Sequence, residues 1–190
     1  MSRARAVAQA GMIAAVYGGL TLVTVQFLGP LAWGPIQLRV SEAATVLAFF
    51  TPAAVPGLAL GSVVANLYTL ASTGTPVAML DVVFGSLGTL LGAAWTWRFR
   101  SNVSLGLMGP VLANALIVPA YLPIVVKALG LPLYKVPILG INFEGRWLPM
   151  YLFGFVTIAL GQSIVMFGLG LPLLVALRRL GLQERLGGRV

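Results

Sequence analysis

The chain has 190 residues, of which 59% are hydrophobic and only 8% are charged, and its net charge is +8. Soluble domains carry about 25% charged residues, so this composition excludes an ordinary soluble protein. The absence of cysteine and histidine excludes disulfides, thiolate metal sites and a histidine proton shuttle, and we expect no cofactor. The basic residues lie at segment ends rather than in one patch, which predicts membrane topology rather than nucleic-acid binding.

Apolar segments follow one another along the whole sequence, and they predict an all-α membrane protein. We expect a six-transmembrane-helix bundle that forms a single integral membrane domain over residues 1–190. The first segment is too long for a cleavable signal peptide and lacks a convincing small-residue cleavage site. The predicted spans are residues 7–28, 37–51, 54–72, 77–97, 103–127 and 148–177.

The second span is short, and two interpretations of it are open. Either residues 37–51 form a short or tilted span, or residues 43–72 form one long helix kinked at Pro52 and Pro56. Loop charges favour the first, because cytoplasmic loops are enriched in Lys and Arg. Six spans split the basic residues 8 inside to 4 outside, whereas five spans give 5 inside and 7 outside. We therefore predict six spans, cytoplasmic N- and C-termini, and a cytoplasmic turn at "TPAAVPG".

Three connections then face outward, at residues 29–37, about 72–78 and 129–147. The last contains "GLPLYKVPILGINFEGRW", which mixes prolines, glycines, aromatics and charges and is too irregular to cross lipid. A long loop in a compact membrane domain is often functional, for example as a lid, and a simple connector is the alternative.

Small residues recur every four positions in the first span, at Ala6, Ala10 and Ala14, with Gly11 and Ala15 beside them. Such stripes let a second helix approach closely in lipid, where packing drives association. The partner helix could belong to another protein or to this same bundle. Spacing alone favours the bundle, since a chain with 23 glycines contains many such stripes.

Ionisable residues inside a bilayer are costly and indicate functional sites. Arg39 and Glu42 share a helix face at the external end of the second span, and Asp81 opens the fourth span near the same side. An Arg39–Glu42 salt bridge, with N-capping by Ser41 or Asp81, would explain these residues without a ligand.

Uncharged polar and aromatic residues extend this pattern. Asn66, Asn114 and Gln162 lie in spans three, five and six, where each could simply bond across helices. An interfacial belt explains most of the external aromatic residues, which are Trp33, Tyr121, Tyr134, Phe143, Trp147 and Tyr151. Three of the four acidic residues, Glu42, Asp81 and Glu144, lie at or near the external face. Their convergence predicts a polar, aromatic-lined pocket that opens outward.

The sequence contains no GxxxxGK[ST] phosphate loop, and no chain of titratable groups crosses the midplane. An outward pocket and a small-residue face fit a binding subunit that another protein moves. An intramembrane enzyme would need a cluster of titratable groups near the cytoplasmic face, which the sequence does not provide. A purely structural subunit would leave the external acids unexplained.

Two stretches resemble the queuosine-precursor transporter family: "IQLRVSEAATVLAFFTPAAVPGLALGSVVANL" at residues 36–67 and "LDVVFGSLGTLLGA" at residues 80–93. Members of this family are the substrate-binding S components of energy-coupling factor (ECF) transporters. Similar stretches are "GMIAAVYGGLT" in the first span and "GPVLANALIVP" in the fifth, so the resemblance covers most of the chain. Its specific part is the region from residue 36 to residue 93.

The resemblance implies a six-helix S component in a prokaryotic cell membrane that captures a 7-deazaguanine, such as the 7-cyano or 7-aminomethyl form. It also implies three partners, a transmembrane coupling subunit and two cytoplasmic ATPases that topple the S component, so the chain itself is not an enzyme. The small residues Ala10, Gly11, Ala14 and Ala15 would face the coupling subunit. One departure is Gln162 in "LGQS", where the family often has a glutamate. A different vitamin-like ligand is the alternative.

A guanine-like edge offers adjacent N–H donors to one carboxylate and an oxo group to an amide or an arginine. Its flat ring can also stack on aromatic side chains. We predict that Glu42 or Asp81 is this carboxylate, with further polar contacts from Arg39, Asn66, Asn114 and Gln162. Trp33, Tyr121 and Trp147 are candidates for stacking, and Glu144 in the long loop is a candidate for closing the pocket.

Overall fold

The computed structural model describes residues 2–28, 38–128, 130, 135–136 and 140–182, and almost all of them are helical. Within these described ranges, five helices are long and apolar enough to cross a membrane, and a shorter apolar helix lies between the first two. The chain is therefore an all-α, multi-pass membrane protein, as its composition predicts. The number of crossings and the side on which the termini lie stay predictions.

The helices follow one another with short connections, except before α5. In chain order they are α1 (Arg3–Leu28), 3-10 helix η2 (Val40–Phe49), α2 (Ala54–Thr73), 3-10 helix η3 (Pro76–Ala78), π-helix η4 (Asp81–Gly85), α3 (Ser86–Arg98), α4 (Val103–Ala128), α5 (Trp147–Ser163), π-helix η6 (Ile164–Gly170) and α6 (Leu171–Arg179). Between α4 and α5, strands β1 (Lys135–Val136) and β2 (Ile141–Asn142) pair antiparallel. The predicted loop at residues 129–147 therefore contains a short ribbon.

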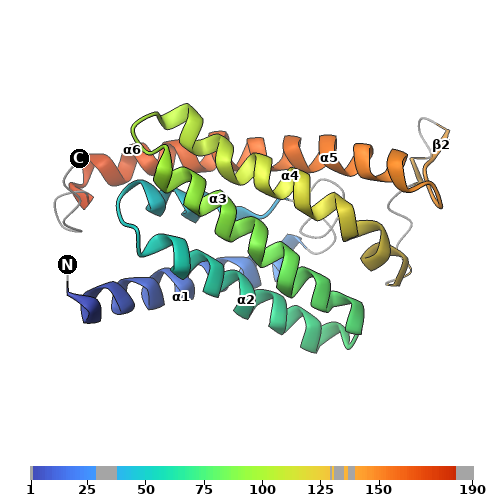
Figure 1. Cartoon of the computed structure of the whole chain (residues 1–190), viewed down its shortest axis with the longest axis horizontal. Helices are drawn as coiled ribbons and strands as arrows, with labels where there is room; N and C mark the ends of the chain where they lie inside the picture. Colours follow the sequence, from blue (N-terminus) through green and yellow to red (C-terminus); the bar gives the residue numbers. More distant parts are fainter. Residues whose placement is uncertain (1, 29–37, 129, 131–134, 137–139, 183–190) are drawn as a thin grey trace.

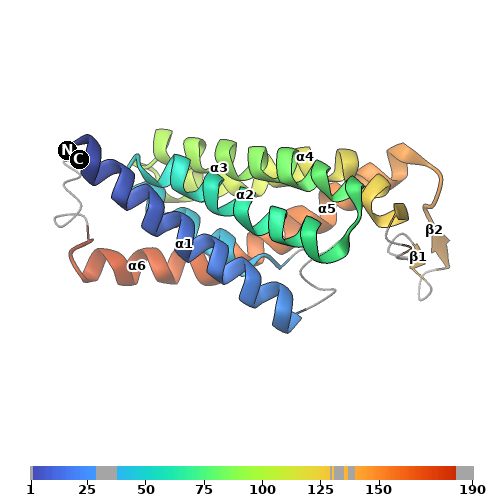
Figure 2. The same ribbon diagram turned by 90° about the horizontal axis from the view of Figure 1, so that it is seen from below.

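Successive passes run in opposite directions along the long axis of the molecule (Figure 1). The start of α1 and the end of α6 consequently lie at one end, and the β1–β2 ribbon lies at the other (Figure 2). α1 packs against α2, α3 against α4, and α4 against α5, while η2 contacts α1, α3 and η6. This arrangement places η2 in the interior, surrounded by the long helices.

The predicted break at the two prolines is confirmed. η2 and α2 are separate helices, which excludes one continuous kinked helix. Pro52 lies in the turn between them, and Pro56 lies in the first turn of α2, where a missing N–H leaves no helical bond unmade. Thr51 ties this turn to α1, because its hydroxyl donates to Gln9 Oε1 at 3.0 Å.

The helix η2 is shorter than the predicted span and is wound differently. A 3-10 helix rises about 2.0 Å per residue, so ten residues cover about 20 Å, less than the roughly 30 Å of a hydrocarbon core. Its residues from Ser41 to Phe49 are buried, apart from Leu47. η2 is thus covered by the bundle on nearly every side rather than exposed to lipid.

Glycines bring α1 and α2 into close contact. A Cβ on Gly57 would lie 2.7 Å from the carbonyl oxygen of Ala10, and one on Gly61 would lie 2.6 Å from that of Ala14. Real Cβ atoms do not approach so closely, so only glycine fits at these two positions. The α1 backbone therefore rests directly on that of α2, as small residues permit between membrane helices.

A side chain of α3 donates a hydrogen bond to a carbonyl of α4 that a proline leaves without its usual helical partner. Pro110 has no N–H, so it cannot donate to the carbonyl of Gly106, four residues earlier. The Thr96 hydroxyl lies 2.9 Å from that carbonyl oxygen and 3.0 Å from the carbonyl oxygen of Gly92 in its own helix. Membrane helices tolerate proline where a neighbouring side chain satisfies the freed group in this way.

This hydrogen bond predicts a coupling between Thr96 and Pro110. Thr96→Val keeps the shape and removes the hydroxyl, so we expect it to lower the free energy of unfolding by about 1–3 kcal/mol. Pro110→Ala returns a backbone donor to Gly106, and Thr96→Val should cost less in that background. Thermal unfolding of the four proteins in one detergent measures the cycle. An equal cost in both backgrounds would show that Thr96 does not serve the freed carbonyl.

Candidate functional site

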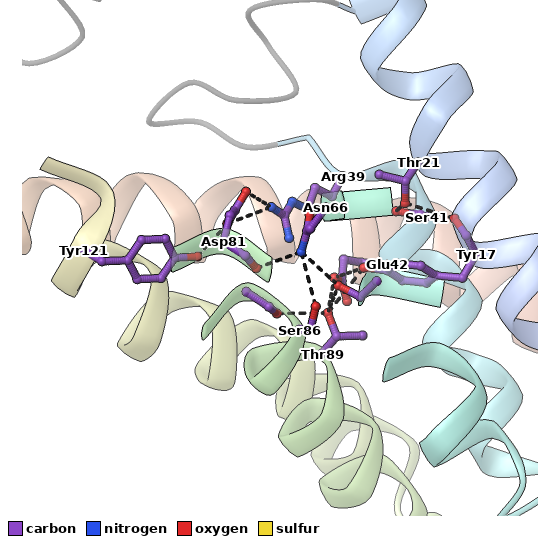
Figure 3. A network of polar contacts seen from close by, with 12 residues as sticks. Tyr17, Thr21, Arg39, Ser41, Glu42, Asn66, Asp81, Ser86, Thr89 and Tyr121 are labelled. Atoms are coloured by element: carbon purple, nitrogen blue, oxygen red, sulfur yellow. Dashed lines mark hydrogen bonds and ion pairs between the residues drawn. The ribbon is translucent and has the colours of Figure 1, made fainter. Parts of the chain in front are cut away.

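Buried polar side chains from α1, η2, α2, η4, α3 and α4 form a connected network in the bundle (Figure 3). Lipid offers no hydrogen bonds, so polar groups in such a protein must satisfy one another. The charged and aromatic members, and the amide and hydroxyls that join them, are Tyr17, Arg39, Glu42, Ser62, Asn66, Asp81, Ser86, Thr89 and Tyr121.

Asp81 is the centre of one half of the network. Arg39 Nη2 lies 3.2 Å from Asp81 Oδ2 and 3.4 Å from Oδ1, and the Tyr121 hydroxyl donates to Oδ1 at 2.6 Å. The side chains of the ion pair are only 8% and 7% exposed. The alternative of an Arg39–Glu42 salt bridge is wrong, and neither Ser41 nor Asp81 caps its helix through a side-chain bond. The ion pair thus joins η2 to η4 across the bundle.

Asn66 and Gly85 shape the backbone around Asp81. Asn66 Nδ2 donates to the Asp81 carbonyl oxygen at 2.8 Å and lies 3.3 Å from Ser86 Oγ. Asp81 and Gly85 begin and end the π-helix η4, a type of segment that is frequent at functional sites. A Cβ on Gly85 would lie 2.8 Å from Asp81 Oδ1, 3.2 Å from the Tyr121 hydroxyl and 3.3 Å from Asn66 Nδ2. Glycine therefore leaves the space in which these three groups meet.

Glu42 is the centre of the other half and accepts hydrogen bonds from hydroxyl groups. The Tyr17 hydroxyl donates to Oε1 at 2.5 Å and the Thr89 hydroxyl at 3.2 Å, while Thr45 lies 3.4 Å from Oε2. Glu42 is fully buried, and within the described ranges no basic side chain forms an ion pair with it. The network therefore contains one guanidinium group and two carboxyl groups.

A small recess lies beside the ion pair. Its lining residues are Thr21, Thr24, Val25, Arg39, Ser41, Asn66 and Thr69. Among the described residues, Arg39 uses only Nη2 for side-chain hydrogen bonds, and Asn66 Oδ1 accepts none. The recess thus presents guanidinium donors, an amide acceptor and several hydroxyls to a ligand.

Asn114 and Gln162 are buried but take no part in the network. Asn114 Nδ2 donates to the Pro110 carbonyl oxygen at 3.0 Å in its own helix, whereas its Oδ1 has no partner in the described part of the chain. Gln162 is fully buried, and neither its Oε1 nor its Nε2 has a partner there. A buried polar group without a hydrogen bond costs about 1–3 kcal/mol, so these amides require an explanation.

The other predicted site residues have different surroundings. Tyr121 contributes its hydroxyl to Asp81, as described. Trp147 is 55% exposed, stacks on Tyr151 with 5.3 Å between ring centroids, and forms no bond to a side chain of the network among the described residues. Glu144 is exposed and follows β2. Trp33 lies outside the described residues. The structure thus brings together Arg39, Glu42, Asn66, Asp81 and Tyr121 from the predicted set.

The predicted partner face on α1 divides into two parts. Ala10 and Ala14 pack against the glycines of α2, so contact within the bundle accounts for them. Gly11 and Ala15 are exposed, and a Cβ on Gly11 would meet no atom within 4 Å. Contact of this exposed part with another subunit stays a prediction.

Sequence reasoning missed the hydroxyl groups, Tyr17 and Thr89 above all. A signal for some of the polar residues was present in α2, where Ser62, Asn66 and Thr69 recur at four- and three-residue spacing and therefore share one face. All three are buried. A polar stripe at helical spacing in an apolar span indicates the face turned toward a polar interior.

Comparison with known families identifies the chain. A model of the QueT transporter family matches residues 7–179. The chain belongs to the QueT transporter family. The match extends from α1 to the end of α6, so it includes every residue of the network, and it confirms the resemblance to S components of ECF transporters that residues 36–93 carry. Searches of curated proteins and of solved structures returned no match.

The ion pair of this QueT family member predicts a strong non-additivity. Arg39→Met or Asp81→Asn leaves the other group buried without its partner, so each should lower the free energy of unfolding by about 3–5 kcal/mol. The double variant should cost far less than the sum, because it leaves no unpaired charge. Chemical unfolding of all four proteins in detergent measures this cycle. Additive costs would mean that the two groups do not depend on each other.

Gly85 yields a second prediction. A methyl group there meets Asp81, Tyr121 and Asn66 at once, so Gly85→Ala should separate them and lower the melting temperature by several degrees. Gly19→Ala is the matched control, since a Cβ on Gly19 meets no atom within 4 Å. Equal melting temperatures for the two variants would show that the polar groups move aside freely.

Proposed function

We propose that this QueT family member is the substrate-binding S component of an ECF-type importer for a queuosine precursor. The substrate is a 7-deazaguanine, such as the 7-cyano or 7-aminomethyl form, captured outside the cell membrane. The observation that carries the proposal is the recess beside the Arg39–Asp81 ion pair, in a chain that belongs to a transporter family. Ionisable groups buried in a membrane bundle indicate a substrate site by default.

The free hydrogen-bonding groups of the recess complement a guanine-like edge. Arg39 keeps N–H donors for an oxo group, and Asn66 Oδ1 can accept from a ring N–H. Glu42 is fully buried and follows Ser41, one of the lining residues of the recess. It would accept further N–H groups in place of the hydroxyls that bond it now.

The charge of the network also favours a ligand with several N–H donors. Asp81 already neutralises the guanidinium of the network, so a ligand that brings a carboxylate or a phosphate would be repelled by Asp81 and would meet no free positive charge. A neutral or cationic heterocycle meets no such repulsion. S components for other vitamin-like molecules remain the alternative, supported by Gln162 at a position where the family often has a glutamate.

The same proposal assigns a topology and partners. Six crossings place both termini in the cytoplasm and the β1–β2 ribbon outside, at the end of the bundle opposite the termini. The exposed Gly11–Ala15 part of α1 would contact the transmembrane coupling subunit. ATP hydrolysis belongs to two cytoplasmic partner subunits.

Calorimetric titration of the purified chain tests this function. We expect 7-cyano- or 7-aminomethyl-7-deazaguanine to bind, and guanine and riboflavin to bind more weakly or not at all. Glu42→Gln and Asp81→Asn should each weaken binding at least about tenfold, or about 1.4 kcal/mol, because each replaces a carboxyl group of the site by an amide. Thr157→Val is the control, since that hydroxyl bonds within α5 away from the network. A folded protein that binds neither deazaguanine would refute the proposed substrate.

A further inference from the structure

The side chain of Gln162 forms no hydrogen bond to any residue that the structure describes. It is fully buried, and its Oε1 and Nε2 are two of only three buried side-chain atoms without a partner in the described ranges. The third is Asn114 Oδ1. An apolar side chain of similar size would leave no such group unpaired and would favour folding. The contacts of the ligand-free protein therefore do not explain why an amide occupies this position.

Gln162 and Asn114 lie at the same level on neighbouring antiparallel helices. α5 packs against α4, and Gln162 is four residues from both Ile158 and Met166, so the three share one face. Two clusters of core residues bracket the amides: one contains Val111 and Met166, and the other contains Val118 and Ile158. The two amides consequently lie between the same two apolar layers.

This level also holds the Glu42 half of the network. A Cβ on Gly88 of α3 would lie 2.9 Å from Asn114 Oδ1, and the adjacent residue, Thr89, donates to Glu42. On the other side, η2 packs against η6, which begins two residues after Gln162. The unpaired amides thus lie beside the residues that surround Glu42, on the side away from α1.

The backbone adds an independent observation. Two π-helices occur among the described residues, and each begins within two residues of a buried polar residue of this region. η4 begins at Asp81, and η6 begins at Ile164, two residues after Gln162. Such segments are rare and occur frequently at functional sites. The irregular winding of η6 therefore coincides with the unpaired amide.

We propose that Gln162 is a specificity-determining residue. Its side-chain amide hydrogen-bonds to a neutral edge of the substrate on which a donor lies beside an acceptor. Its amide carries an acceptor and a donor side by side, so it pairs with such an edge through two parallel hydrogen bonds. Asn114 Oδ1 accepts from a further N–H of the ligand. A 7-deazaguanine has this edge twice, as a ring N–H beside the oxo group and as the pyrrole N–H beside a ring nitrogen. This assignment rests on the proposed function, because it states how the captured base is held.

A comparison of two amides tests the proposal. Gln162→Met removes both polar atoms at nearly constant volume, whereas Asn66→Leu removes an amide that is bonded within the protein. Without ligand, Gln162→Met should keep or raise the melting temperature, and Asn66→Leu should lower it by several degrees. With 7-cyano- or 7-aminomethyl-7-deazaguanine, Gln162→Met should bind at least tenfold more weakly. Gln162→Leu, a second apolar variant, should behave in the same way.

Each outcome decides the question. A fall in melting temperature for both Gln162 variants would mean that the amide has an internal role, which overturns the proposal. Stable variants that bind like the wild-type protein would mean that only water, and not the ligand, contacts Gln162. That result would also overturn the proposal. If the wild-type protein binds neither deazaguanine, the proposed function is wrong, and so is the proposed contact between Gln162 and the base. If the wild-type protein binds and stable Gln162 variants do not, the result supports both the proposed function and the role of Gln162.

Discussion

A charged side chain buried away from water needs a partner of opposite charge. In this bundle Arg39 and Asp81, which are 42 positions apart in the sequence, form such an ion pair. Their contact fixes the start of η2 against the start of η4. The accessory bonds follow from the same requirement: Tyr121 occupies a remaining lone pair of Asp81, and Asn66 holds its backbone carbonyl. Gly85 leaves the room in which these groups converge. The interior is therefore arranged around an ion pair rather than around an apolar core alone.

The empty site is already hydrogen-bonded, which bears on how it selects a ligand. Asp81 and Glu42 each have two or more partners before any ligand arrives. Where a ligand takes the place of such a partner, it exchanges one bond for another, and that exchange contributes little net energy unless its donors fit better than the hydroxyls do. The unpaired amides at Asn114 and Gln162 differ, because a bond made there replaces none. In the proposed site, a bond to one of these amides would therefore contribute more net energy than a bond to Asp81 or Glu42.

Hydropathy and helix breakers were sufficient to place the long helices. The predicted spans at residues 54–72 and 103–127 end within one residue of α2 and α4, because each is an apolar run bounded by turn residues. The cost of ionisable groups in lipid likewise pointed to Arg39, Glu42 and Asp81. Their pairing could not be predicted. Helical i, i+3 spacing joins Arg39 to Glu42, but the backbone of Arg39, at φ −77° and ψ 88°, is not helical, so the shared face does not exist. The π-helices leave no comparable mark in the sequence.

Close packing of α1 on α2 has a consequence for how the two helices find their alignment. The residues of α1 at this contact and one turn to either side are all small, namely Ala6, Ala10, Ala14 and Gly18. A slide of α1 by one turn, about 5.4 Å, would therefore present another small residue to Gly57 and to Gly61, so the small-residue contact alone does not distinguish these alignments. The bonds from Tyr17 to Glu42 and from Thr21 to Ser41 do distinguish them, since either slide breaks both. These polar contacts, together with the buried side chains of Ile13 and Tyr17, thus set the register that the small-residue contact leaves open.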